Sequence, residues 1–320
     1  MSRSHRLTAA ERSQQQITGA DKIMEILLST GSFTPRGISD AASIARQSGA
    51  DGLEVMLTRR LLSAGPEVVI DAAKKYQMPI RSIHPPIRFV NAHQHVHTDM
   101  LAAAAFARET PGCRTLVMHA IGGPGLHTER GRAFFRTIGE VTELLKKSGV
   151  RLAIENRGTV QPRPRLDFLD RLQNLFRVCE EWNLDITFDT SHAASFGLNI
   201  VSSLDVIYPR VANIHLSDRR DEPPALASGI LNSLTREHQL PGTGALPLGM
   251  FLQQLKTKEY RHAVTLELSP IALATWRSQS ALDRTCAAVS FVREYSSATT
   301  LAPDATQRAR RTHAPMENDL

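Results

Sequence analysis

Six ionisable side chains stand out in the sequence because each follows a short apolar run. They are of the kinds that bind divalent cations, and they are spread through the chain: His84, His119, Glu155, Asp189, His215 and Glu267. Any one of them taken alone could be a hydrogen-bonded core residue. Gathered in one place, the carboxylates would repel one another and lose hydration, and a bound cation removes that cost. The set therefore predicts a metal site, provided that the fold brings these residues together.

The apolar runs before these residues are predicted strands, and they alternate with helical patterns. We expect strands at residues 22–28, 51–57, 80–84, 114–120, 151–156, 184–189, 210–216 and 263–268. Several runs are too apolar for a sheet that is wetted on one face, which indicates parallel strands buried on both sides. Apolar residues three and four apart mark two of the helices. These stripes are Phe134, Ile138, Val141 and Leu145 in one helix, and Leu169, Leu172, Phe176 and Cys179 in the next.

Strand and helix alternate about eight times, which predicts a closed (β/α)₈ barrel, an α/β fold known as the TIM barrel. In that fold the carboxyl ends of all strands open on one face, so the six groups become neighbours. A doubly wound open sheet is the alternative, but no GxGxxG follows the first strand to support its dinucleotide-binding form. We expect one barrel domain at residues 21–295 and disordered tails at 1–20 and 296–320.

Several segments resemble one family of barrels when they are taken together in order. They are SIHPP, LVMHA, IENRG, FDTSHAASFG, NIHLSD, HQLPGTG and LELSP. They resemble the xylose isomerase-like TIM barrel superfamily, which holds sugar and sugar-phosphate isomerases and epimerases together with endonuclease IV. The resemblance implies one divalent cation, bound by Glu155, Asp189, His215 and Glu267. It also implies that Glu155 and Glu267 transfer the proton beside a substrate carbonyl, and that His192 contacts a substrate oxygen.

The chemistry of these residue types agrees with that expectation. A hard cation polarises the carbonyl and hydroxyl oxygens of a sugar and stabilises an enediolate, while a nearby carboxylate removes the acidified proton. Carboxylate-rich ligation favours Mn²⁺, Mg²⁺ or Co²⁺, whereas additional imidazoles would favour Zn²⁺. Those imidazoles belong to His84, His119 and His238, which we also assign to substrate binding. Arg157 joins them because a guanidinium suits a substrate phosphate or carboxylate.

Two other functions stay open at this point. Several residues match metal ligands of endonuclease IV, and DTSHAASFG is similar to its signature, so a phosphodiesterase acting on abasic DNA is the alternative. The matching residues are His84, His119, Glu155, Asp189, His192, His215, His238 and Glu267. Arg236 stands where that family supplies an aspartate, and a guanidinium would repel a third cation. A barrel that has lost catalysis and acts as a scaffold is the third hypothesis, which the intact ligand set disfavours.

Composition favours a cytoplasmic enzyme with a small-molecule substrate. The net charge is +6, but aromatic residues make up only 5% of the chain and no basic stripe with interleaved aromatics appears, which disfavours nucleic acid. No apolar run approaches the roughly 18 residues of a membrane span, and no signal-peptide core is found. The isolated Cys113, Cys179 and Cys286 indicate reduced thiols. A homo-oligomer is compatible with the sequence, which fixes neither the oligomeric state nor the sugar.

Overall fold

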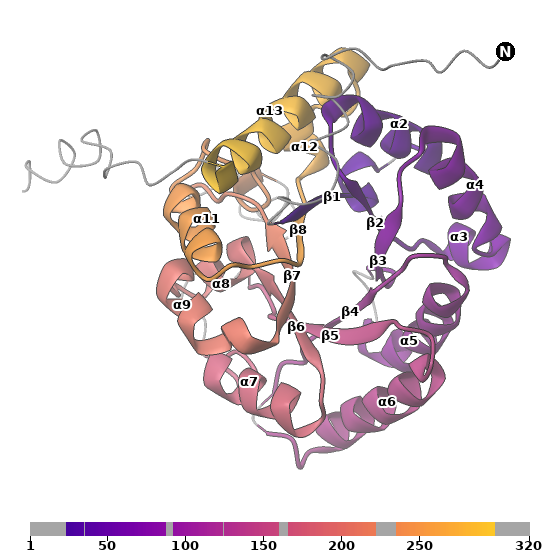
Figure 1. Cartoon of the computed structure of the whole chain (residues 1–320). Helices are drawn as coiled ribbons and strands as arrows, with labels where there is room; N and C mark the ends of the chain where they lie inside the picture. Colours follow the sequence, from indigo (N-terminus) through magenta and orange to yellow (C-terminus); the bar gives the residue numbers. More distant parts are fainter. Residues whose placement is uncertain are drawn as a thin grey trace, which may run out of the picture.

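Eight parallel strands form a closed barrel in the order of the sequence (Figure 1). The structure is a computed structural model that describes residues 24–34, 36–87, 92–123, 125–159, 166–221 and 235–297. The strands are β1 (Glu25–Ser29), β2 (Gly52–Met56), β3 (Ile80–His84), β4 (Thr115–His119), β5 (Arg151–Glu155), β6 (Asp185–Asp189), β7 (Val211–Leu216) and β8 (Ala263–Leu266). Each coincides with a predicted run. The (β/α)₈ barrel is thus confirmed, and the open sheet is excluded.

Helices surround the barrel on its outside (Figure 1). They are α2 (Ile38–Ser48), α3 (Arg59–Ala64), α4 (Glu67–Tyr76), α5 (Ala92–Glu109), α6 (Glu129–Leu145), α7 (Leu172–Glu181), α8 (Thr190–Ser195), α9 (Ile200–Ile207), α11 (Leu248–Thr257), α12 (Pro270–Leu273) and α13 (Ser278–Ser297), with 3₁₀ turns η1 (Thr30–Phe33) and η2 (Tyr208–Arg210). Among the described residues, no helix combines the length and the apolar character that a membrane crossing requires.

The helices bury apolar stripes against the strands, and one predicted stripe needs correction. In α6 the four predicted residues are all buried. Of the predicted residues of the next stripe, Leu169, Leu172 and Cys179 are buried and Phe176 is partly buried against the core. Leu169 is the exception in position, because it lies in a turn before α7, which begins at Leu172. The buried face of α7 also includes Leu175 and Val178.

The two predicted tails fall largely beyond the part of the chain that the structure describes. The predicted N-terminal tail, residues 1–20, lies outside the described residues, as does the C-terminal tail from residue 298. Helix α13 continues to Ser297, past the predicted domain boundary at residue 295. No glycine or proline near that boundary stops the helix earlier.

Candidate metal centre

The four predicted metal ligands lie together where the strands end. Glu155 and Asp189 are the last residues of β5 and β6, His215 is the last but one of β7, and Glu267 directly follows β8. One ligand atom from each lies within 4.8 Å of the others. The side chains of Asp189 and His215 are 0% exposed, that of Glu155 is 1% exposed, and that of Glu267 is 12% exposed. The barrel therefore builds a buried, carboxylate-rich cluster that opens to solvent at Glu267.

His215 occupies the middle of this cluster. Its Nδ1 lies 2.7 Å from Oε2 of Glu267, 3.3 Å from Oε1 of Glu155 and 4.0 Å from Oδ2 of Asp189. Strands β6 and β7 are hydrogen-bonded neighbours with Asp189 opposite His215. Strand β8 pairs with β7 on the other side, with Leu266 opposite Leu216. Parallel pairing, with one register shift between Ile186 and Thr187, thus brings the side chains together.

Several atoms of the cluster have no hydrogen-bond partner, which tests whether a cation fits. Among the described residues, Glu155 Oε1 and Oε2, Asp189 Oδ2, His215 Nδ1 and Glu267 Oε2 are buried and lack a partner of acceptable geometry. Leaving a buried carboxylate oxygen unsatisfied is costly. A divalent cation would satisfy these atoms at once, and three carboxylates with one imidazole form a donor set that such ions accept. The residues fit a divalent metal.

The electrostatics of the cluster also favour a bound cation. Burial disfavours the charged form of Glu155, yet His119 and His215 beside it hold its pKa well below the usual range. Burial likewise opposes ionisation of Glu267, and His215 outweighs it, so the pKa of Glu267 is also lowered. Burial would lower the pKa of His215, but Glu54, Glu267 and Glu155 raise it well above the ordinary value. The carboxylates therefore favour positive charge at this point of the barrel.

Two further histidines approach Glu155 from β3 and β4. His119, the last residue of β4, places Nε2 2.9 Å from Oε2 of Glu155. His84, the last residue of β3, has Nε2 3.5 Å from the same oxygen and 3.2 Å from Nε2 of His119. These three residues form a second group whose geometry could hold a cation. The His119 side chain is 43% exposed, so a molecule in the barrel mouth can reach it.

His192 and His238 lie next to Asp189. Asp189 caps α8, because its Oδ1 accepts a hydrogen bond from the backbone N–H of His192 at 2.7 Å. His238 has a left-handed backbone with φ of 51°, which is uncommon for a residue with a side chain. The two imidazole rings meet edge to face with centroids 5.4 Å apart. Together with Asp189 they form a third group that could hold a cation.

Two arginines from the sequence analysis have protein partners. Arg157 donates from Nη2 to Asp170 at 2.5 Å and to Asp167 at 2.9 Å. Its substrate-binding role stays a prediction, and a substrate anion would compete with these two carboxylates. The Arg236 guanidinium donates to the carbonyl oxygens of Arg220 and Asp221, at 2.8 and 3.2 Å. Main-chain oxygens rather than carboxylates thus hold the arginine that stands in place of an aspartate.

Asn156 supports the cluster and was missed by the sequence analysis. Its Oδ1 accepts from the Asp189 backbone N–H at 2.7 Å, and its Nδ2 donates to the Asp189 carbonyl at 3.0 Å. Its own carbonyl lies 3.0 Å from Nδ1 of His192. The side chain therefore joins β5 to β6 directly beside two ligands. An amide immediately after a predicted ligand, in IENRG, is the signal that could have identified it.

Glu54 is the second residue that the sequence analysis missed. It lies in the middle of β2, is fully buried, and has Oε2 3.1 Å from Nε2 of His215. The same oxygen accepts hydrogen bonds from Ser82 Oγ at 2.7 Å and Asn213 Nδ2 at 3.0 Å. An acidic residue inside the apolar run DGLEVML was the available signal, since buried glutamates are rare unless they are paired.

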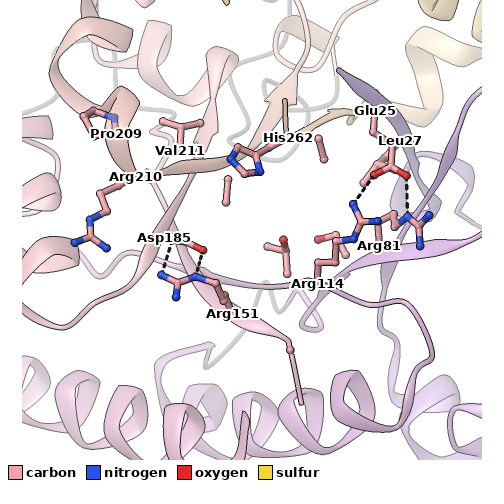
Figure 2. A pocket seen from close by; sticks show the side chains of 15 residues that line it. Glu25, Leu27, Arg81, Arg114, Arg151, Asp185, Pro209, Arg210, Val211 and His262 are labelled. Atoms are coloured by element: carbon pink, nitrogen blue, oxygen red, sulfur yellow. Dashed lines mark hydrogen bonds and ion pairs between the residues drawn. The ribbon is translucent and has the colours of Figure 1, made fainter. Parts of the chain in front are cut away.

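A cavity of about 360 Å³ opens at the other end of the barrel, where the strands begin. Figure 2 shows that Glu25 and Asp185 are paired with arginines of the same lining, while Arg210 lies apart from them. Arg151 and Asp185 form a bidentate ion pair at 2.6 and 2.8 Å, and Glu25 accepts from Arg81 at 2.7 Å and Arg114 at 3.4 Å. None of the predicted site residues lines this cavity. We therefore place the functional site at the carboxyl ends of the strands.

The chain resembles known proteins in sequence. A family model described as "Xylose isomerase-like TIM barrel" matches residues 42–284. An inosose isomerase of Halalkalibacterium halodurans is 27% identical over 144 residues, which is 45% of this chain and 48% of the relative. The match thus spans about half the length of that curated relative.

Solved structures share the fold at low sequence identity. A D-allulose 3-epimerase from Methylomonas sp., in complex with D-allulose, superposes with a TM-score of 0.64 and 16% identity, covering 85% of this chain and 97% of the epimerase. The IolI protein with a bound zinc atom has a TM-score of 0.64 and 18% identity, covering 86% of this chain and 100% of that protein.

Proposed function

Because the chain belongs to the xylose isomerase-like TIM barrel family, we propose that it is a divalent-metal-dependent isomerase or epimerase. Its proposed substrate is a sugar, a sugar phosphate or a related polyhydroxy carbonyl compound. The observation that carries the proposal is the cluster of Glu155, Asp189, His215 and Glu267, whose ligand atoms lie within 4.8 Å of one another. The inosose isomerase and the allulose epimerase that resemble the chain support this substrate class.

The four cluster residues would hold the cation. Three carboxylates favour Mn²⁺, Mg²⁺ or Co²⁺, and the zinc atom bound by the IolI protein supports testing Zn²⁺ beside them. When bound, the cation would polarise the substrate carbonyl and offset the negative charge that develops next to it.

Glu155 and Glu267 are the proposed acid–base pair. Their oxygens approach His215 Nδ1 from two sides, at 3.3 and 2.7 Å. Both pKa values are lowered, so both groups are ionised at neutral pH and can accept a proton. One carboxylate takes the proton from the carbon beside the carbonyl, and the C–H electron pair moves into the enediolate. For an epimer, the second carboxylate takes up a proton from solvent and delivers it to the opposite face of the same carbon. For an isomer, the first carboxylate returns its proton to the neighbouring carbon while a hydroxyl proton moves between the two enediolate oxygens.

The proposed substrate contacts surround this pair. They are His84, His119, His192, His238 and Arg157. Among them, the His119 side chain is 43% exposed and that of His192 is 16% exposed, so the mouth of the barrel offers imidazole nitrogens to substrate oxygens. A small-molecule partner, a cytoplasmic location and a homo-oligomer compatible with the fold stay predictions.

Proton exchange tests the proposal directly. Metal-loaded protein is incubated with a panel of ketoses, inososes and sugar phosphates in D₂O, and exchange at the carbon beside the carbonyl is followed by NMR. We expect exchange that disappears with a chelator and returns with Mn²⁺ or Co²⁺. Glu155→Gln and Glu267→Gln are expected to lose it, while the exposed Glu67→Gln in α4 keeps it. Unchanged exchange in either cluster variant would refute the assigned roles.

The phosphodiesterase function has one observation in its favour. Besides the main cluster, His84, His119 and Glu155 form one group that could hold a cation, and Asp189, His192 and His238 form another. Elemental analysis of protein purified without chelators separates the two functions. One Mn, Mg or Co per chain supports the isomerase, and about three zinc ions together with nicking of abasic duplex DNA would support the nuclease.

A further inference from the structure

A carboxylate reaches the central histidine from across the barrel. Glu54 belongs to β2 and His215 to β7, and β1 and β8 lie between these strands in the closed sheet. Even so, Glu54 Oε2 lies 3.1 Å from Nε2 of His215, and both side chains are 0% exposed. We infer that Glu54 is a positioning residue that fixes the tautomer and orientation of His215 for cation binding. The inference rests on the cation site of the proposed function and needs no particular substrate.

The contact determines which imidazole nitrogen carries the hydrogen. A neutral imidazole has one N–H group, and an ionised carboxylate can only accept a hydrogen bond. Glu54 therefore favours the hydrogen on Nε2, which leaves the lone pair on Nδ1. That atom lies 2.7 Å from Glu267 Oε2 and has no hydrogen-bond partner among the described residues. The lone pair thus points into the space that the other ligands surround.

Neighbouring strands hold Glu54 in this position. Ser82 Oγ of β3 and Asn213 Nδ2 of β7 both donate to the oxygen that faces His215, at 2.7 and 3.0 Å. Asn213 is in turn fixed by Thr265 Oγ1 of β8, which donates to its Oδ1 at 2.8 Å. All of these side chains are buried. The network leaves the carboxylate little freedom to turn away from the imidazole.

A purely structural role for Glu54 would not explain why this buried side chain is a carboxylate. All three hydrogen-bond contacts given above for Glu54 use Oε2, and Oε1 is buried with no hydrogen-bond partner in the part of the chain that the structure describes. Burying an ionised carboxylate with one unsatisfied oxygen is unfavourable, and a neutral side chain could fill the same space at lower cost. The negative charge is useful where positive charge collects next to it, and a carboxylate behind a ligating imidazole raises its basicity. The cation site supplies that positive charge.

Glu54→Gln tests the inference because it keeps the shape and removes the charge. We expect the Kd for Co²⁺ to rise about 10- to 100-fold. The visible absorption of bound Co²⁺ is expected to change, and metal-free protein should melt near the wild-type temperature. Glu25→Gln is the matched control, since it makes the same change at the start of β1, where the Glu25 side chain is 22% exposed and contacts Arg81 and Arg114 rather than the cluster. Its Co²⁺ affinity is expected to change by less than about threefold. Wild-type affinity and absorption in folded Glu54→Gln would overturn the inference.

A measurement on the wild type covers the case in which Glu54→Gln does not fold. With diamagnetic Zn²⁺ bound, a long-range ¹H–¹⁵N spectrum reports which nitrogen of His215 carries hydrogen. The Nε2–H form is expected, and hydrogen on Nδ1 would overturn the inference. The two proposals fail separately. Wild-type protein that binds no divalent ion would refute the proposed function itself, whereas normal metal binding with the wrong tautomer would refute only the role of Glu54.

Discussion

The two ends of the barrel are built from charged residues but use them in opposite ways. Where the strands begin, each acid has a basic partner, as in the bidentate pair of Arg151 and Asp185. Where they end, Glu155 has imidazole neighbours, but within the described part of the chain its buried oxygens lack a hydrogen-bond partner of acceptable geometry. The first end pairs its acids with arginines, whereas the second gathers carboxylates around imidazoles. This difference, rather than the size of the cavity, supports the proposed site at the carboxyl ends of the strands.

Strand β6 carries one aspartate at each end, so it offers the sharpest test of this contrast. We expect Asp189→Asn to reduce metal-dependent proton exchange by about 10³-fold or more, because a neutral amide weakens the hold on the cation. Asp185→Asn, at the other end of β6, is expected to leave exchange unchanged. Rates at saturating substrate and several Mn²⁺ concentrations provide the measurement. Equal losses in both variants would show that the two ends are not functionally distinct.

Adding ions to the intact protein tests the same contrast without a mutation. A divalent cation at 1,000 times its Kd is expected to raise the free energy of unfolding by about 4 kcal/mol, since it binds only the folded cluster. Sulfate at the same ionic strength should stabilise far less, because the arginines at the other end already have carboxylate partners. Urea unfolding with each salt measures both effects. Strong stabilisation by sulfate would contradict the assignment of that end as balanced.

Asn156 should matter more than a similar asparagine outside the cluster. Asn156→Ala removes two buried hydrogen bonds to the Asp189 backbone, so we expect it to lose about 1–3 kcal/mol of stability and to weaken Co²⁺ binding. Asn174→Ala removes one bond, from Nδ2 to the Phe168 carbonyl, and is the control. It should leave Co²⁺ affinity unchanged. Urea unfolding and a Co²⁺ titration distinguish the two variants.

The smallest effect is expected for the ion pairs at the start of the strands. Arg151→Ala should cost only about 0.5–1 kcal/mol, because the Arg151 side chain is 49% exposed and solvent screens the pair. The loss should shrink as salt is added. Co²⁺ affinity is expected to stay at the wild-type value, and a reduced affinity would link the two ends in a way that the charge contrast does not allow.

The strands and the set of six ionisable residues at their ends could be predicted from local pattern and topology, and the resemblance to a known family selected the four ligands among them. Parallel strands buried on both faces appear as continuous apolar runs, and one rule of the fold places every carboxyl end at the same mouth. The same rule places the amino ends of the strands together, so the pairing of Arg151 with Asp185 could also have been predicted.

Contacts across the barrel could not be read from the sequence in the same way. Glu54 and His215 are 161 positions apart and lie on strands that do not pair. No periodicity connects such residues, because their contact depends on how side chains fill the closed interior. The assignment of Leu169 to the helix failed for a different reason, since an apolar residue in a turn directly before a helix can be buried in line with its stripe.

The position of Glu267 links the ligand set to closure of the barrel. This ligand directly follows β8, the strand that closes the barrel by pairing with β1, with Ile26 opposite Val264 (Figure 1). The other three ligands come from β5, β6 and β7, so an unclosed sheet would present them without the fourth. A bound cation would connect the strands of the second half of the barrel, and the contact of His215 with Glu54 would connect them to the first half. A complete set of the four ligands therefore requires a closed barrel.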